Sequence, residues 1–381
     1  MNRMQNHSIQ SVAALLFLAL SQVIVAQPVF PELTGPFDVG RIELDVLDEQ
    51  RAETFTEEPE DKRRLLVSLY YPAEVPAGTA RAGYVPEQLM TALSFTDEQR
   101  AWPSSGYADF PMREGSYPVL LFSPGLGNMT FLYSSLLYEL ASEGYVIAAL
   151  WHPYSTSLTA FPDGSVLRRN DAGGVTGTTL EEQMAELERL GIVWVDDLLF
   201  VRDQLAAWNA THPLLQGHLD LERMGAFGHS FGGAAALQAA HQDEGIDAVV
   251  NMDGTMFGEV ARVGSRVPFL FLQSDPLPPT DEQLSEAGIS REESDAEDKL
   301  QDDVRNETLR LSANATLRKL EKGRHNAYFT DQLFISAVLP PEERSRRLGD
   351  IDPASAFQQI RTWVSDFMAL HVRRDGTPLP E

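Results

Sequence analysis

A short glycine-rich motif constrains the fold of this chain more than any other feature. Gly228-His-Ser-Phe-Gly-Gly233 has the pattern Gly-x-Ser-x-Gly and lies between an apolar run at 223–227 and an alanine-rich stretch at 234–240. In that setting the pattern is typical of a nucleophile elbow, a sharp strand-to-helix turn that exposes a serine. Its glycines remove side chains where strand and helix pass closely. The motif therefore predicts an α/β fold with Ser230 as nucleophile; the alternative is a tight turn with a solvated serine.

The rest of the chain alternates between strand-like and helix-like segments. This alternation is typical of a mostly parallel sheet with helices on both faces. Four apolar residues recur at helical spacing, and we expect them to face the sheet: Trp194, Leu198, Val201 and Leu205. The expected strands are 65–71, 118–123, 145–150, 223–227, 247–252, 267–273 and 315–320, and the expected helices are 131–142, 187–209, 230–241 and 353–372.

Three stretches interrupt this pattern. Residues 43–61 are acidic and predict a loop between early strands, whereas 155–182 carry Asp-Gly and Gly-Gly pairs and predict an excursion over the strand ends. Residues 275–306 are dense in acidic side chains, so we expect an exposed insertion that is partly helical at best. No repeat or linker divides the chain, which predicts a single domain over 27–381.

Composition excludes several classes of function. The 381-residue chain has a formal net charge of −26, so nucleic acids and anionic membrane surfaces are poor partners. It contains no cysteine, which excludes disulfides, thiol catalysis and cysteine-ligated zinc.

The first residues resemble a secretory signal. Arg3 precedes an apolar run at 12–20, and Val25-Ala26 provides a small-residue cleavage site before Gln27. The run is short for a membrane span. We expect a signal peptide at 1–26 and a secreted or periplasmic protein. Ile24 stands where a smaller residue is preferred, so an uncleaved anchor is the alternative.

A serine nucleophile needs a histidine base, which in turn needs a carboxylate to orient it. In elbow-type hydrolases the chain order is serine, acid, histidine. Of the eight histidines, those that follow Ser230 are His241, His325 and His371. His325 directly follows a strand-like run in a turn, which predicts it as the base, whereas His241 ends the elbow helix and His371 lies in a charged tail. The neighbouring His229 is expected to orient backbone or pack.

Two aspartates fit the position of the acid. Asp253 follows the strand-like run 248–252, and Asp275 follows the next run at 269–273. The residues alone leave both open, with Gly254 slightly favouring a specialised turn at Asp253.

The oxyanion of an acyl-transfer intermediate needs two N–H donors. One is expected from the residue after the nucleophile, Phe231. The other is expected from the glycine-containing loop after an earlier strand, where Leu126 is the candidate; a plain glycine-rich connector is the alternative reading.

Taken together, these segments resemble the platelet-activating factor acetylhydrolase family of serine-dependent phospholipases A2. No single block is diagnostic, but their order and spacing are fairly specific and cover most of the chain. The matching blocks are Gly35–Gly40, Leu69–Pro72, Tyr117–Gly127, Leu140–Ala149, Gly228–Ala234, Met252–Phe257 and His325–Phe329.

The resemblance implies Asp253 as the acid and supports Leu126 and Phe231 as oxyanion donors. It further implies an α/β-hydrolase that cleaves short or oxidised sn-2 acyl chains of phospholipids, with transient contact at lipid interfaces and with no metal or cofactor. Pro124 and Thr255 depart from the family pattern, which has histidine and a bulky aromatic near these positions. A general short-chain carboxylesterase or polyester hydrolase is one alternative. A non-catalytic binding protein on the same fold is the other.

Overall fold

The computed structural model describes residues 27–177 and 179–375, which form a nine-stranded central sheet covered by helices. The expected signal peptide at 1–26 lies outside the described residues. In spatial order the strands are β11 (Ala315–Lys319), β10 (Phe269–Gln273), β9 (Ala248–Met252), β8 (Leu219–His229), β4 (Tyr117–Ser123), β5 (Val146–Trp151), β2 (Lys62–Pro72), β1 (Val39–Ala52) and β3 (Tyr107–Ala108).

The sheet is mostly parallel, because β2 alone runs antiparallel to its neighbours β1 and β5. All seven expected strands are present. Along β4 and its neighbours, alternate side chains enter two separate hydrophobic cores: Leu120 and Phe122 pack on one face, Val119 and Leu121 on the other. A fully buried strand of this kind requires helices on both faces. The α/β-hydrolase class predicted from the sequence is therefore confirmed.

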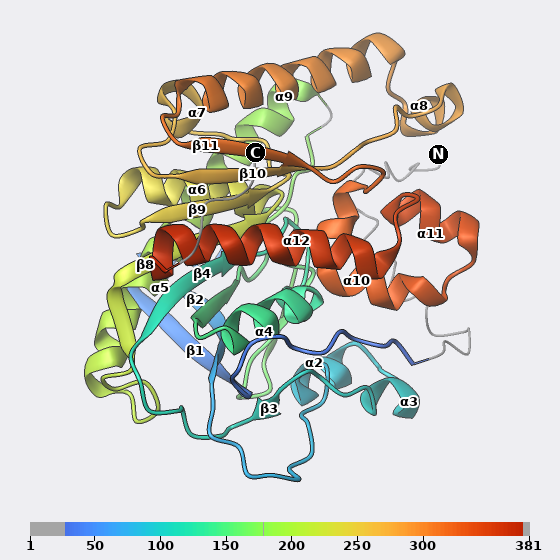
Figure 1. The fold of residues 1–381 in the computed structure, drawn as a ribbon. Helices are drawn as coiled ribbons and strands as arrows, with labels where there is room; N and C mark the ends of the chain where they lie inside the picture. The colour runs from blue at the N-terminus through green and yellow to red at the C-terminus, as the bar shows by residue number, and fades with distance from the viewer. Residues whose placement is uncertain (1–26, 178, 376–381) are drawn as a thin grey trace.

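The helices divide between the two faces (Figure 1). One face is covered by α4 (Ser134–Ser142), α10 (Thr330–Ile335) and α12 (Pro353–Met368). The other is covered by α5 (Leu180–Thr211), α6 (Phe231–Gln242), α7 (Val260–Val263) and α9 (Arg291–Leu311). On α5, all four side chains predicted to face the sheet are fully buried in this second core.

The remaining elements are short and lie in the connections. They are α2 (Glu87–Ala92), α3 (Asp97–Arg100), the hairpin of β6 (Leu158–Ala160) and β7 (Val166–Arg168), α8 (Asp281–Ala287) and α11 (Pro341–Leu348). Single helical turns are η3 (Thr130–Tyr133), η4 (His325–Tyr328), η5 (Ser336–Val338) and η6 (Ala369–Arg373).

Two predictions about the interruptions were wrong. Residues 43–52 are not a loop but most of β1, because their backbone pairs with β2 from Glu43 opposite Ser68 to Asp48 opposite Arg63. Residues 275–306 are also more helical than expected. Capping boxes at Thr280 and Ser290 start α8 and α9, satisfying N–H groups that no earlier turn can pair.

Charge pairs and packing explain why such an acidic segment is helical. Lys299 pairs with Asp303, and Arg305 pairs with Asp302, at helical spacing along α9. The buried Thr308 packs α9 against α7, with its hydroxyl 2.8 Å from the Val304 carbonyl of its own helix and 3.3 Å from the Ala261 carbonyl of α7. The segment therefore gains tertiary contacts that its composition does not reveal.

Candidate active site

Ser230 occupies the sharp turn between β8 and α6. Its backbone has φ 53° and ψ −128°, a region that costs a non-glycine residue conformational energy and is concentrated at functional sites. The Ser230 amide donates to the Met252 carbonyl at 2.8 Å, which ties the turn to the end of β9. The side chain lies half-buried at the carboxyl edge of the parallel strands.

The glycines of the motif allow the loop after β4 to press against this turn. A Cβ atom at Gly228 would lie 2.6 Å from the Ser123 carbonyl oxygen, and one at Gly232 would lie 2.1 Å from the Pro124 carbonyl oxygen. Neither position has space for a side chain. The elbow and the loop that carries Leu126 are therefore in backbone contact.

The structure brings Asp253 and His325 together from separate loops. Asp253 Oδ2 lies 2.6 Å from His325 Nδ1, and Oδ1 accepts the Ser274 amide at 2.8 Å. The Asp253 side chain is 12% exposed, whereas that of His325 is 43% exposed. Asp253 is therefore enclosed by the protein, whereas the His325 ring is accessible from outside.

A specialised turn presents Asp253. Its φ is 64°, in the left-handed region, and the next residue, Gly254, has no room for a side chain because a Cβ atom would lie 2.0 Å from the Ser230 carbonyl oxygen. The buried Asn251 side chain clamps this turn, accepting from the Gly254 amide at 2.8 Å and donating to the Gly254 carbonyl at 2.9 Å.

The protonation of the pair follows from its contacts. Burial raises the pKa of Asp253, but the hydrogen bonds from His325 and Ser274 outweigh it and leave the pKa below its ordinary value. An ionised Asp253 accepts a hydrogen bond from the Nδ1–H of His325, so in the neutral ring Nε2 carries no proton and is an acceptor. Within the described residues no hydrogen bond joins Ser230 to His325; in free hydrolases such bonds are often loose and tighten with substrate.

Asp275 does not contact His325. Its side chain pairs with Lys319 at 2.8 Å and accepts the Lys322 amide at 2.9 Å, and its carbonyl accepts from Arg324. These contacts fasten the loop that precedes His325. The two aspartates that the sequence left open thus occupy different places, one beside the imidazole and one behind its loop.

The two predicted oxyanion donors lie on the segments that touch at Gly232. Phe231 is the first residue of α6, and Leu126 lies between Gly125 and Gly127 in the loop after β4. Within the described residues neither amide donates a hydrogen bond to the protein, so both remain available to a ligand. Gly127, at φ 81°, is fastened by Ser155, whose carbonyl accepts its amide at 3.0 Å.

The other two histidines after the serine have different surroundings. His241 Nε2 lies 3.4 Å from Glu259 at the end of α6, and His371 packs against Phe367 in the C-terminal turn. His229 is fully buried next to the elbow.

Sequence reasoning missed a second serine, histidine and aspartate arrangement beneath the loop after β4. His152 Nε2 lies 3.0 Å from Ser123 Oγ, and its Nδ1 lies 2.8 Å from Asp197 Oδ2. Burial lowers the pKa of His152, against the effect of Asp197, so the ring is neutral at pH 7. All three residues are fully buried, so a substrate cannot reach Ser123. Of the two serines, only the partly exposed Ser230 is therefore a candidate nucleophile.

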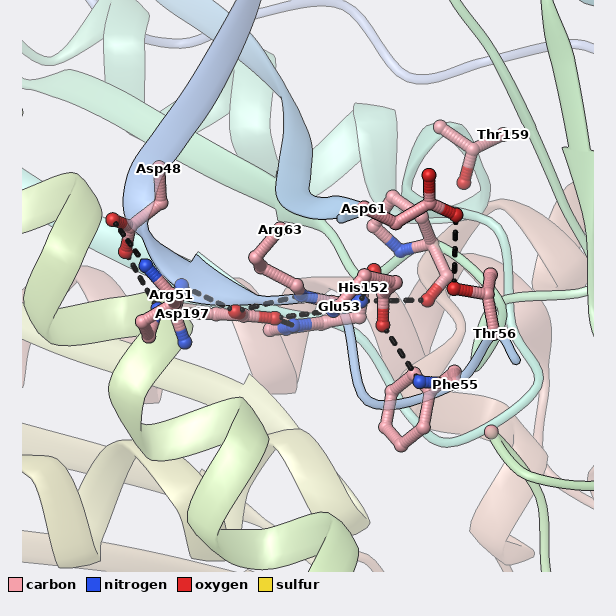
Figure 2. A network of polar contacts seen from close by, with 12 residues as sticks. Asp48, Arg51, Glu53, Phe55, Thr56, Asp61, Arg63, His152, Thr159 and Asp197 are labelled. Atoms are coloured by element: carbon pink, nitrogen blue, oxygen red, sulfur yellow. Dashed lines mark hydrogen bonds and ion pairs between the residues drawn. The ribbon is translucent and has the colours of Figure 1, made fainter. Parts of the chain in front are cut away.

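Asp197 is the centre of a buried charge network (Figure 2). Arg63 binds both of its carboxylate oxygens, at 3.0 and 2.6 Å, and also pairs with Glu53 at 3.0 Å. Arg51 adds a further contact to Asp197 at 2.8 Å. Burial raises the pKa of Asp197, but Arg63 and His152 outweigh it and hold the pKa well below its ordinary value. No local motif reveals this network, because its members come from β1, β2, α5 and the end of β5.

The network reaches the elbow through aromatic stacking. The His152 ring stacks on Trp194 with centroids 3.8 Å apart, and Trp194 meets Phe231 edge-on at 5.1 Å. Trp194 of α5 thus packs against Phe231, the residue that follows Ser230.

The described residues contain no cluster of three or more histidine, aspartate or glutamate side chains suited to a metal ion. Among the helices of residues 27–375, omitting 178, none has the length and apolar character needed to cross a bilayer.

Comparison with solved structures gives an independent view of the fold. A ferulic acid esterase from Streptomyces cinnamoneus superimposes with a TM-score of 0.73 over 93% of this chain and 97% of that one. At 24% sequence identity the likeness concerns the fold alone.

Sequence comparison identifies relatives. A probable 1-alkyl-2-acetylglycerophosphocholine esterase from Arthroderma benhamiae is 26% identical, covering 93% of this chain and 91% of its own length. Platelet-activating factor acetylhydrolase from Cavia porcellus is 28% identical over 43% of this chain and 42% of its own length, so that match spans less than half of either protein. The family model described as platelet-activating factor acetylhydrolase, isoform II, matches residues 23–171 and 206–287, more than half of the sequence. The chain therefore belongs to the platelet-activating factor acetylhydrolase isoform II family and is a carboxylic ester hydrolase.

Proposed function

We propose that this protein hydrolyses short or oxidised sn-2 acyl chains of phospholipids through a triad of Ser230, His325 and Asp253. The observation that carries the proposal is the 2.6 Å hydrogen bond between Asp253 and His325, formed at the same sheet edge as the Ser230 elbow. The names of two relatives support the substrate class, since one is a probable 1-alkyl-2-acetylglycerophosphocholine esterase and the other a platelet-activating factor acetylhydrolase.

In the first half of the reaction His325 Nε2 takes the proton from Ser230 Oγ, which attacks the acyl carbonyl. The Leu126 and Phe231 amides donate to the oxyanion of the tetrahedral intermediate. Asp253 stabilises the imidazolium through Nδ1. When the intermediate collapses, the ester bond breaks, His325 returns the proton to the departing alcohol, and an acyl-serine remains.

Water completes the reaction. His325 removes a proton from a water molecule that attacks the acyl-serine, the same amides bind the second oxyanion, and the carboxylic acid leaves as Ser230 regains its proton. Every proton moves among Ser230, His325, substrate and water. The proposal assigns no step to a metal or cofactor.

The substrate is tested with phosphatidylcholines that share one headgroup and carry acetyl, hexanoyl or palmitoyl chains at sn-2, beside p-nitrophenyl acetate. We expect kcat/KM to fall as the sn-2 chain lengthens and Ser230→Ala to abolish turnover of all of them. Rapid cleavage of p-nitrophenyl acetate without cleavage of any phospholipid would contradict the substrate and favour a general esterase.

We further propose that residues 1–26 are a signal peptide and that 27–381 form the secreted or periplasmic enzyme as one α/β-hydrolase domain. Arg3 and the apolar run before Val25-Ala26 support this proposal. Mass spectrometry of the protein exported by its host tests it: a mature N-terminus at Gln27 is expected, and an intact N-terminus would indicate an anchor.

A further inference from the structure

A chain of buried hydrogen bonds links the two loops on either side of Ser230. The Gly125 amide lies 3.0 Å from Tyr133 Oη, Tyr133 Oη lies 3.0 Å from His229 Nδ1, and His229 Nε2 lies 3.2 Å from the His325 carbonyl oxygen. Both Tyr133 and His229 are fully buried. One end of this chain is the loop that carries Leu126, and the other end is the backbone of the proposed base.

Chemistry fixes the direction of every bond in the chain. The His325 carbonyl can only accept, so His229 Nε2 carries the proton, and Nδ1 of the neutral ring is then an acceptor. Tyr133 donates its hydroxyl proton to that nitrogen, and its oxygen accepts the Gly125 N–H. Every donor along this chain thus faces an acceptor, from the Gly125 amide to the His325 carbonyl.

The surroundings keep both side chains in these protonation states. Burial lowers the pKa of His229 well below its ordinary value, and the nearby His325 lowers it further, so His229 stays neutral even when His325 becomes charged. Burial also raises the pKa of Tyr133 well above its ordinary value, against hydrogen bonds with Gly125 and Asn128. The donor and acceptor pattern therefore persists through a catalytic cycle.

Ring packing fixes the geometry of the chain. The His229 and His325 rings lie 4.4 Å apart, and Phe329 meets His229 edge-on at 4.3 Å and Tyr133 at 5.2 Å. On the other side, a Cβ atom at Gly125 would lie 3.1 Å from His229 Nδ1. His229 thus fills the space between the two loops.

We propose that His229 and Tyr133 are positioning residues that set the distance between the oxyanion amides and the base, the first through the His325 backbone and the second through the Gly125 amide. The inference rests on the proposed function, because it gives these residues a task only if Leu126 and His325 act on the same intermediate. Loss of either positioning residue should therefore lower kcat and leave KM unchanged.

The test is Tyr133→Phe, which removes one oxygen and keeps the ring. We expect kcat to fall about 10- to 100-fold while KM is unchanged, since a small misplacement of catalytic groups costs rate. Tyr145→Phe is the matched control, because its hydroxyl is also buried but has no hydrogen-bond partner among the described residues. We expect that variant to retain wild-type kcat. A burst titration with an activated phosphonate gives the active fraction, so that misfolded protein is not counted as slow enzyme.

A second pair of variants addresses His229 directly. His229→Phe removes both hydrogen bonds and should lower kcat at least as far as Tyr133→Phe does, whereas His229→Gln keeps an amide donor near the Nε2 position and should recover part of the loss. Wild-type kcat in Tyr133→Phe, or a loss confined to KM or to the active fraction, would overturn the inference. Wild-type turnover in Ser230→Ala would instead overturn the proposed function itself, so the two failures are distinguishable.

Discussion

Asp253 Oδ2 lies 2.6 Å from Nδ1 of His325, although 72 residues separate the two in sequence. Two strand ends produce this contact: Asp253 follows β9, and His325 follows the turn after β11. Parallel strands place their carboxyl ends at one edge of a sheet, so residues that follow different strands meet there.

The acid is tested by comparing Asp253→Asn with Asp275→Asn. We expect the first to lower kcat by roughly 10⁴-fold, because an amide disfavours the tautomer that leaves Nε2 free to accept a proton. Asp275→Asn should have a much smaller effect, since Asp275 contacts Lys319 and Lys322 rather than the imidazole. Steady-state hydrolysis of p-nitrophenyl acetate measures both. The reverse order of effects would contradict the assignment.

Asp197 should be a major determinant of stability. Asp197→Asn leaves Arg63 buried with a single carboxylate partner, Glu53, and breaking buried pairs of this kind costs about 3–5 kcal/mol. The free energy of unfolding in urea measures the loss. Asp203→Asn serves as the control, because the Arg202–Asp203 pair is exposed and such pairs contribute little. Equal free energies of unfolding for the two variants would contradict a large contribution of Asp197 to stability.

The buried Asp331 should give stability a distinct pH dependence. Burial raises its pKa to about 7, against hydrogen bonds from the Ser135 amide and the Tyr84 hydroxyl. An unfolded aspartate ionises near pH 4, so the folded state holds this proton over a range where the unfolded state has lost it. The stability contributed by the protonated group is complete below about pH 4 and is lost as pH rises to about 7.

Asp331→Asn removes this dependence. The slope of unfolding free energy against pH should become shallower between those limits by up to about 1.4 kcal/mol per pH unit. Glu43 and Glu143 also have pKa values raised to about 7 by burial, so the wild-type slope includes them and the difference between the two proteins isolates Asp331. The free energy of unfolding is measured by urea denaturation from pH 4 to 8. If its dependence on pH were the same in wild type and Asp331→Asn, the raised pKa of Asp331 would be contradicted.

The sequence predicts those parts of the site that rest on local chemistry. Gly-x-Ser-x-Gly indicates Ser230 because a strained turn needs glycines, and chain order indicates His325. The choice between Asp253 and Asp275 depends on which strand end faces the imidazole, and the residues alone left it open. Residues 43–52 were mistaken for a loop because their charged side chains mask the pairing of β1 with β2.

The buried arrangement around Asp197 lay beyond sequence reasoning for a different reason. The arrangement combines residues from separate strands and from α5. The side chains that contact Asp197 lie between 45 and 146 residues away from it along the chain. Nothing local distinguishes a buried aspartate from a solvated one. The hydrogen bonds of His229 were hidden in the same way, since its Tyr133 and His325 partners are both 96 residues distant.

The central claim is that Ser230, and not the buried Ser123, is the nucleophile, and covalent labelling tests it most directly. Wild-type protein, Ser230→Ala and Ser123→Ala are treated with a fluorophosphonate, and the modified peptide is identified by mass spectrometry. We predict one adduct, on Ser230, in the wild type and in Ser123→Ala, and no adduct in Ser230→Ala. An unlabelled wild type, or an adduct that persists in Ser230→Ala, would contradict the account.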